Sequence, residues 1–428
     1  MTSPLWRKLL VLVAVLVCGT ASSCAAITDA GTVSVLASWT GAEETAFRKV
    51  LAVFTDRTHI RVDYQGTRAL DQVLAADVQR GTAPDVAMLP NPGSLAAYAD
   101  HGLLRLDFLE HEVGKSYPAA WSGLQHAGKA TLYAVAVKAD LKSAIWFRPA
   151  RLPGALPATW QQLLDRTRAV TASGGTPWCL GLAAPPTSGW PGTDWIEDLL
   201  LHSAGPEVYR RWAAGTLSWT SPQVRQAWLD WGTLVVHPGG VSGGPSSALL
   251  TDFGDAGRPL FADPPGCLLE HQGSFVMSTY AALGKVAGRD YDLLPFPGPR
   301  VSEVSADLAG MFHDTAGARR LLEFLISPEA QEIWVRNGVA TVFSARADVP
   351  LTAYGDATKQ EVARMLTVDP KVCFDASDLM PAAMSGAFYR AVLEFVNDPG
   401  QLDVLLGRLE DTRRGIPVAD WLDVPCGQ

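Results

Sequence analysis

The pattern that most restricts the fold is an alternation of short apolar runs with longer amphipathic segments near the start of the chain. Residues 33–37, 60–64 and 84–89 are short and apolar, which is typical of buried strands. Residues 42–54 and 69–79 carry apolar side chains at helical spacing. Strands that alternate with helices favour an α/β fold with a mostly parallel sheet. Ligands of such sheets bind at the carboxyl ends of the strands, where each strand turns into a helix.

The later chain continues this pattern less regularly. Helical periodicity recurs in residues 159–170, 194–203, 222–236 and 316–337, the last interrupted at Ser327-Pro328. Short apolar stretches lie at residues 291–296 and 306–313. The texture changes past residue 138, after which the chain becomes rich in Pro, Gly and Trp. We therefore expect a second structural unit to begin near residue 139.

The first residues have the organisation of a secretory signal peptide. Arg7 and Lys8 form a short positive region, residues 9–17 are uniformly apolar, and small residues precede Cys24. The apolar run is too short to span a bilayer as a stable anchor. A cysteine after small residues also predicts lipoprotein processing, with lipid attached to Cys24 after cleavage. Because Ala21 stands where leucine is usual, secretion without lipid is the alternative.

Charge and length narrow the class of protein further. Loss of Arg7 and Lys8 with the signal peptide would change the formal net charge from −9 to −11. An acidic chain without a run of Lys or Arg is a poor partner for nucleic acid or anionic lipid. About 400 mature residues exceed one typical core and predict two lobes. No later stretch is apolar for long enough to span a bilayer, so we expect membrane attachment through lipid only.

The cysteines that follow residue 24 are Cys179, Cys267, Cys373 and Cys426. An even number outside the cytosol predicts two disulfides, for which three connectivities exist. Proximity in the sequence favours Cys179–Cys267 and Cys373–Cys426. No CxxC, Cys/His or HExxH spacing suits zinc, so we predict no metal site.

Several segments, in this order along the chain, resemble the extracellular carbohydrate-binding proteins of bacterial ABC importers. They are residues 33–66 (VSVLASWTGAEETAFRKVLAVFTDRTHIRVDYQG), 81–93 (GTAPDVAMLPNPG), 133–149 (YAVAVKADLKSAIWFRP) and 325–339 (LISPEAQEIWVRNGV). Residues 189–201 (GWPGTDWIEDLLL), between Cys179 and Cys267, are similar to the branch that binds α-glucosides and other oligosaccharides. This likeness also supports the Cys179–Cys267 pairing.

The resemblance implies a two-lobed, periplasmic-binding-protein-like α/β fold with a hinge and discontinuous lobes. The expected division is a signal peptide of residues 1–23, one lobe of residues 32–139 and 305–347, and another of residues 140–304 and 348–428. A monomer anchored outside the cytoplasm would capture a sugar, such as a di- or oligosaccharide of the α-glucoside type, between the lobes. It would deliver this carbohydrate to ABC permease subunits, with no cofactor and no catalysis of its own.

A sugar site needs aromatic planes for the apolar face of the ring and polar side chains for the hydroxyl groups. The candidates in strand-end turns and loops are Trp39, Glu43, Asp85, Asn91, Trp190, Asp194, Trp195 and Gln272. The resemblance adds Arg346 as a cationic position near the ligand. Structural alternatives remain, because Asp194 could only cap a helix, Glu43 could only face a helix dipole, and Arg346 could form a surface salt bridge.

A secreted hydrolase is the main alternative function. Residues 240–244 (GVSGG) match GxSxG around Ser242, but a nucleophile elbow needs a strand before the serine and a helix directly after it. The Gly, Pro and Ser residues of 238–247 instead predict a loop. Asp194 and Glu197 share a helix face and could form a carboxylate pair for glycoside hydrolysis, although such spacing is common on ordinary helices.

Overall fold

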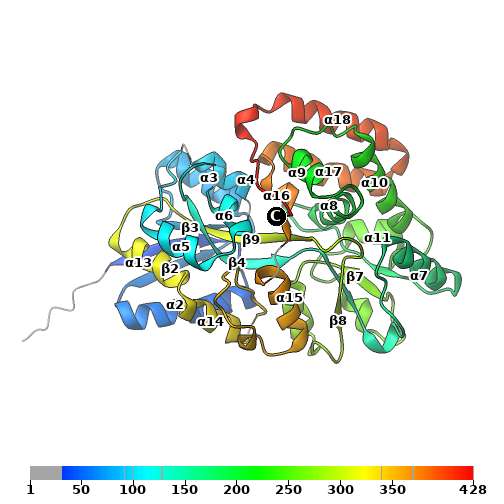
Figure 1. The fold of residues 1–428 in the computed structure, drawn as a ribbon, viewed down its shortest axis with the longest axis horizontal. Helices are drawn as coiled ribbons and strands as arrows, with labels where there is room; N and C mark the ends of the chain where they lie inside the picture. Colours follow the sequence, from blue (N-terminus) through cyan, green and yellow to red (C-terminus); the bar gives the residue numbers. More distant parts are fainter. Residues whose placement is uncertain are drawn as a thin grey trace, which may run out of the picture.

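The computed structural model describes residues 31–427 except for residues 91, 100, 127–128, 339 and 369–370. The predicted signal peptide and Cys24 lie outside the described residues. The described chain forms two lobes that lie side by side (Figure 1). Within this part of the chain, no helix is both long and apolar enough to span a membrane.

The first lobe contains a parallel sheet, which confirms the prediction from the alternating pattern. β1 (Thr32–Ala37) pairs in parallel with β2 (Arg61–Gly66) on one side and with β3 (Val86–Leu89) on the other. α2 (Ala42–Thr58) follows β1, and α3 (Leu70–Arg80) follows β2. The apolar face of α2 is buried, and α3 ends at a glycine whose left-handed backbone terminates the helix.

Two long strands extend from the first lobe into the second. The carboxyl end of β9 (Ser302–Met311) runs antiparallel to β3, and its amino end pairs in parallel with β10 (Val372–Phe374). β4 (Ala134–Leu141) lies antiparallel along β9. Two residues after β4 the chain enters β5 (Ala144–Phe147), which belongs to a second sheet. The change of texture past residue 138 therefore coincides with a strand that crosses between the lobes (Figure 1).

The second sheet is small and is fastened by a disulfide. Its strands lie in the order β6 (Trp178–Cys179), β7 (Leu269–His271), β5 and β8 (Asp292–Pro295). Cys179 on β6 is bonded to Cys267 just before β7, which closes 88 residues of chain. The second disulfide joins Cys373 on β10 to Cys426 in the C-terminal tail. Both pairings that sequence proximity favours are therefore present.

Helices cover the sheets on both sides. Those around the first sheet and the crossing strands are α4 (Pro92–Tyr98), α5 (Glu110–Ser116), α6 (Ala119–Gln125), α13 (Ala316–Leu325), α14 (Pro328–Arg336), α15 (Ala357–Thr367) and α16 (Ala376–Leu379). Those of the second lobe are α7 (Trp160–Ala172), α8 (Trp190–Ala204), α9 (Pro206–Ala213), α10 (Pro222–Val235), α11 (Gly244–Leu250), α12 (Val276–Ala282), α17 (Ala382–Asn397) and α18 (Leu402–Gly415). The predicted interruption at Ser327-Pro328 separates α13 from α14, and the Ser327 side chain caps α14.

Most tryptophans of the second lobe form its core. Trp212 and Trp219 lie edge to face with ring centroids 4.9 Å apart, and Trp219 meets Phe388 of α17 at 4.8 Å. Trp228 and Trp231 of α10 pack against Phe395 of the same helix α17. Aromatic pairs in these orientations add to the free energy gained by burying their area. Most tryptophans of this region therefore stabilise the core of the second lobe.

One helix begins earlier than the sequence predicts, and another lies where the sequence predicts a loop. α8 starts at Trp190 rather than near Asp194, and α11 starts at Gly244 inside the predicted loop of residues 238–247. In both cases a proline occupies the first turn, where its fixed backbone and missing N–H favour a helix start. Asp194 therefore lies within α8, and the interpretation of Asp194 as an N-cap is wrong.

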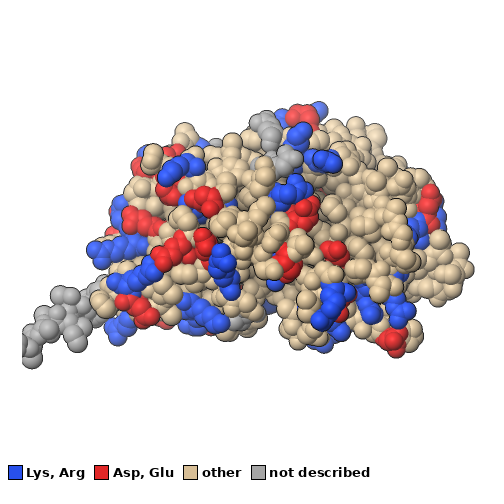
Figure 2. All heavy atoms as spheres, turned by 60° about the horizontal axis from the view of Figure 1, so that its bottom comes forward, with Lys and Arg blue, Asp and Glu red and all other residues tan. Residues whose placement is uncertain are grey.

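The exposed surface mixes both signs of charge. Figure 2 shows one face of the molecule, on which Lys and Arg side chains alternate with Asp and Glu. Exposed pairs such as Arg57 with Glu329 and Arg225 with Asp403 belong to this mixture. Such pairs contribute little to stability, and this face of the described chain presents no broad patch of one sign.

Candidate ligand-binding site

A cleft of about 630 Å³ lies between the two lobes. The turn that follows β1, the start of α3 and the crossing strands β4 and β9 line one part of it. The first turn of α8, the segment around Phe253 and the residues after β10 line the rest. This volume falls within the range of small-molecule sites, and its position at the carboxyl end of β1 is the one that the α/β pattern predicts.

Trp39 and Glu43, two of the predicted residues, line this cleft from the first lobe. The Trp39 ring is 2% exposed, packs edge to face against Phe47 and Trp334, and donates a hydrogen bond from Nε1 to Asp307 Oδ2 at 3.1 Å. Glu43 lies in the first turn of α2, and its Oε1 accepts a hydrogen bond from a buried lysine of β4 at 2.9 Å. Glu43 is therefore an ion-pair partner at the cleft wall.

That lysine, Lys138, is surrounded by carboxylates. Its Nζ lies 2.9 Å from Glu43, 3.2 Å from Asp140 and 3.6 Å from Asp307. Burial alone would lower the pKa of Lys138, but the three acids raise it well above the usual value, so the ammonium stays charged. Burial raises the pKa of Asp307 to about 6 even though Lys138 opposes the shift. The cluster fixes one positive and several negative groups along one wall.

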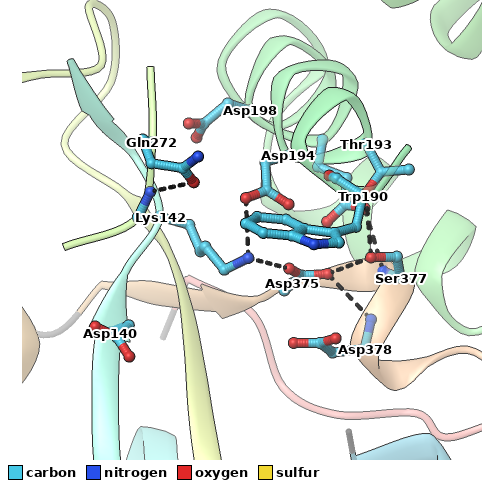
Figure 3. Close-up of polar contacts among 12 residues, drawn as sticks. Asp140, Lys142, Trp190, Thr193, Asp194, Asp198, Gln272, Asp375, Ser377 and Asp378 are labelled. Carbon is cyan, nitrogen blue, oxygen red and sulfur yellow. Dashed lines mark hydrogen bonds and ion pairs between the residues drawn. The ribbon is translucent and has the colours of Figure 1, made fainter. Parts of the chain in front are cut away.

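A second buried lysine, Lys142, forms ion pairs at the other side of the cleft (Figure 3). Lys142 Nζ lies 2.9 Å from Asp194 Oδ2 of α8 and 3.0 Å from Asp375 Oδ2, directly after β10. Burial raises the pKa of Asp194 to about 6. Burial also acts to raise the pKa of Asp375, but Lys142 and the hydrogen bond from Ser377 outweigh it and lower the value. Lys142 thereby joins the crossing strand β4 to α8 and to the segment after β10.

The carboxylates behind Lys142 are the only group of at least three potential metal ligands that the described residues bring together. Asp194, Glu303 and Asp375 each offer an oxygen within 4.8 Å of the others, and all three are buried. Lys142 already supplies a positive charge to two of these acids. The arrangement therefore serves as an internal ion-pair cluster, and no role in binding a metal needs to be invoked for it.

An aromatic wall faces these charges. Trp190 at the start of α8 meets the rings of Phe253 and Phe275 at centroid distances of 5.0 and 5.8 Å, and all three line the cleft. Lys142 Nζ lies 4.8 Å from the centre of the Trp190 ring. Across the cleft, the exposed Arg68 places its guanidinium 5.5 Å from the Phe253 ring. Apolar planes beside charged groups suit a ligand with one apolar and one polar side.

Other predicted residues lie away from the cleft lining. The Trp195 ring packs against Trp178 and against His271, with centroid distances of 4.7 and 4.4 Å, inside the second lobe. Gln272 turns its Oε1 back to the N–H of Gly273. Asp85 accepts hydrogen bonds from the N–H and the hydroxyl of Ser34, which join the start of β3 to β1. Asn91 lies outside the described residues.

Arg346 holds the first lobe together instead of lining the cleft. Its guanidinium is 1% exposed and pairs with Glu112 at 2.8 Å and Asp348 at 2.6 Å, and it donates to the carbonyl of Ile326. These contacts join the loop after α14 to α5 and to the end of α13. The structure therefore gives this residue a stabilising role in an ion-pair network.

We expect Arg346→Met to lower the free energy of unfolding by about 2 kcal/mol, because Glu112 and Asp348 lose their ion pairs and the carbonyl of Ile326 loses a hydrogen-bond donor. The estimate is below that for a fully buried pair, since both acids are partly exposed. Urea unfolding measures the loss, and ligand affinity should change less than about twofold. A large loss of affinity with unchanged stability would contradict this role and favour the predicted contact with ligand.

Several cleft residues are absent from the sequence-based candidates, and one signal could have identified them. Lys138, Asp140 and Lys142 stand at alternate positions along and just after an otherwise apolar strand, so they share one face of it. Charged groups in a buried strand are costly unless they are paired. The charged residues in the run AVAVKADLK therefore indicate that one face of this strand lines a polar cavity. Asp307 on β9 carries the same signal.

Comparisons with known proteins agree with this architecture. The model of the family described as bacterial extracellular solute-binding protein matches residues 38–332. The α-glucosides-binding periplasmic protein AglE of Rhizobium meliloti is 32% identical, with 88% of this chain and 86% of AglE covered. The osmoprotective compounds-binding protein GgtB of Synechocystis sp. is 33% identical, with 88% of this chain and 91% of GgtB covered.

Solved structures share the fold at lower identity. A chitin oligosaccharide binding protein superposes with a TM-score of 0.74 at 16% identity, covering 90% of this chain and 98% of that one. Its two-lobed architecture matches the two sheets and crossing strands described above. Since the family model spans more than half of the chain and relatives align over most of its length, this chain belongs to the family of bacterial extracellular solute-binding proteins.

Proposed function

We propose that this chain captures a di- or oligosaccharide, with an α-glucoside as the first candidate, and delivers it to the permease of an ABC importer. The observation that carries the proposal is the wall of Trp190, Phe253 and Phe275 opposite the ion pairs of Lys138 and Lys142. A pyranose ring has an apolar C–H face for the aromatic planes and hydroxyl groups for the carboxylates. The α-glucoside-binding relative supports this choice of ligand class.

The two lobes supply a mechanism for capture. A ligand that contacts Glu43 from the first lobe and Trp190 from the second bridges both sides of the cleft. Such a ligand gains contacts only when the lobes are closed, so it shifts the population toward the closed state. The strands β4 and β9 would act as the hinge, with lobes of residues 32–139 plus 305–347 and 140–304 plus 348–428. The closed monomer, anchored through lipid at Cys24, would then dock on the permease.

The geometry supports binding without turnover. Asp194 is held by Lys142, and both Glu197 oxygens accept backbone N–H groups, from Ala376 at 2.8 Å and Ser377 at 3.2 Å. These two carboxylates are thus engaged inside the protein and do not flank a cleft-bound glycosidic bond as a hydrolase requires. Ser242 follows a β-bridge between Val241 and Trp178 and is followed by α11. This local structure is nearer to a nucleophile elbow than the loop that the sequence predicts. However, the buried His271 turns its Nε2 to Asp198 at 2.7 Å and leaves its Nδ1 without a hydrogen-bond partner, so it is not bonded to Ser242.

We expect Trp190→Ala to weaken binding of maltose or another bound α-glucoside by about 30-fold, because truncation of an aromatic anchor costs about 2 kcal/mol. Isothermal titration on the purified chain, with thermal shift as a first screen of sugars, provides the measurement. Trp160→Ala is the matched control, since Trp160 stacks on Phe296 outside the cleft lining and its loss should leave affinity unchanged. Stabilisation by peptides or polyamines and by no sugar would refute the proposed ligand class.

A further inference from the structure

The charged groups that line the cleft are mostly acids. Seven carboxyl groups and three basic groups line it in the part of the chain that the structure describes. The acids are Glu43, Asp71, Asp140, Asp252, Asp307, Asp375 and Asp378, and the bases are Arg68, Lys138 and Lys142. A low-dielectric cleft strengthens the field of such an excess, because solvent screens it poorly.

The positive charge of each buried lysine is already balanced by carboxylates of the protein. Lys138 lies within 3.6 Å of three carboxylates, and Lys142 lies within 3.0 Å of two. Both ammonium groups are almost fully enclosed, with side-chain exposures of 6% and 7%. Arg68 is exposed at the edge of the cleft, where its guanidinium lies over the Phe253 ring. An anionic ligand would therefore meet paired lysines in the interior and a single solvated arginine at the entrance.

Two carboxyl groups of the lining, Asp71 and Asp378, form no ion pair within the described part of the chain, and they come from opposite sides of the cleft. Asp71, in the first turn of α3, has a buried Oδ1 without a hydrogen-bond partner. Asp378, on α16, uses its backbone N–H for Asp375 at 3.0 Å, and among the described residues no donor bonds to its carboxylate. Burial raises the pKa of both carboxyl groups; at Asp378 the neighbouring charge of Asp375 adds to this shift and that of Lys142 opposes it. A ligand that donates hydrogen bonds would satisfy them.

We propose, building on the sugar-binding function above, that Asp71 and Asp378 are ligand-facing acceptors that make the cleft reject acidic sugars. Hydroxyl and ammonium groups donate to a carboxylate, whereas phosphate and carboxylate substituents only accept and add charge of the same sign. The ligand class is thus narrowed to neutral or basic glycosides. Sugar phosphates and uronic acids are excluded by repulsion and by the unmet acceptors, which is specificity through an unfavourable contact.

The test compares matched ligands by isothermal titration on the full mature chain. Maltose and trehalose are measured beside maltose 6′-phosphate, trehalose 6-phosphate and 6-amino-6-deoxytrehalose. We expect each phosphate to bind at least about 100-fold more weakly than its parent, which corresponds to two buried like-charge contacts. The amino derivative should bind no more weakly than trehalose. A phosphate that binds as tightly as its parent would overturn the inference.

Variants separate charge from size. Asp71→Asn with Asp378→Asn keeps the shape of the cleft, so a purely steric exclusion of phosphate would leave the phosphate-to-parent ratio unchanged. We expect the dissociation constant of the phosphate, divided by that of its parent sugar, to fall by at least about tenfold in the double variant. Asp165→Asn is the control, because Asp165 is 63% exposed on α7 and does not line the cleft. If no neutral sugar binds the wild type, the proposed function fails; if neutral sugars bind and the ratio does not move, only this inference fails.

Discussion

Lys142→Met is expected to destabilise the protein by about 3–5 kcal/mol, the largest effect of any single substitution that we predict. Lys142 is almost fully buried and holds Asp194 and Asp375, whose side chains are each 2% exposed. Without the ammonium group, these carboxylates must either stay charged in a dry environment or take up protons. The lysine also connects three segments that are far apart in the sequence: the end of β4, α8 and the segment after β10.

Urea unfolding monitored by tryptophan fluorescence measures this loss. Lys359→Met is the matched control, because Lys359 forms a partly exposed pair with Asp356 within one helical turn and should change stability by less than about 1 kcal/mol. Adding Asp194→Asn and Asp375→Asn to Lys142→Met should recover most of the lost stability, since the unpaired charges are then removed. A loss below about 1 kcal/mol for Lys142→Met alone would show that the pair contributes little.

The second large effect concerns the disulfide of the second lobe. Replacing Cys179 and Cys267 by alanine should lower the free energy of unfolding by about 4–5 kcal/mol, because the bond closes a loop with a sequence separation of 88 residues. Opening that loop gives the unfolded chain more conformational entropy. Both cysteines are buried beside β7, so the loss should appear as earlier unfolding of the second lobe.

Urea unfolding under oxidising conditions provides this measurement. Replacing Cys373 and Cys426 should cost slightly less, about 4 kcal/mol, since their separation is 53 residues. A reducing agent should destabilise the wild type more than either double variant, because each variant has one bond left to lose. Equal stability of the wild type and the Cys179/Cys267 double variant would mean that the closed loop is already restrained in the unfolded chain.

Local patterns predicted the elements well where propensity and packing agree. The first three strands and two helices were identified because the runs of β1 and β3 coincide with mostly buried strands and each periodic segment coincides with a half-buried helix. β2 was identified as well, although only its Tyr64 is buried. The disulfide pairing followed from proximity along the chain. The start of α8 was misplaced and α11 was not predicted, because Trp190-Pro191 and Gly244-Pro245 look like loop residues, although proline in a first turn favours a helix.

The candidate site was only partly predictable, for a physical reason. Trp39, Glu43 and Trp190 were found because they lie in turns and first helical turns, which often position ligand-binding residues. Asp71, Asp375 and Asp378 could not be placed, because their relation to the cleft depends on contacts between segments hundreds of residues apart. Arg346 shows the converse, since its sequence position allows a ligand contact and its neighbours in space make it an internal ion pair.

The sequence by itself determined the α/β class, the crossing near residue 139, the two disulfides and the family resemblance. Each of these depends on local periodicity, composition or order along the chain. Only the tertiary structure decided which charges share an environment: that Lys138 and Lys142 are neutralised from within and that Asp71 and Asp378 remain available. Electrostatic interactions depend on distance and on the surrounding dielectric, and neither is encoded in the spacing of residues along a single strand or helix.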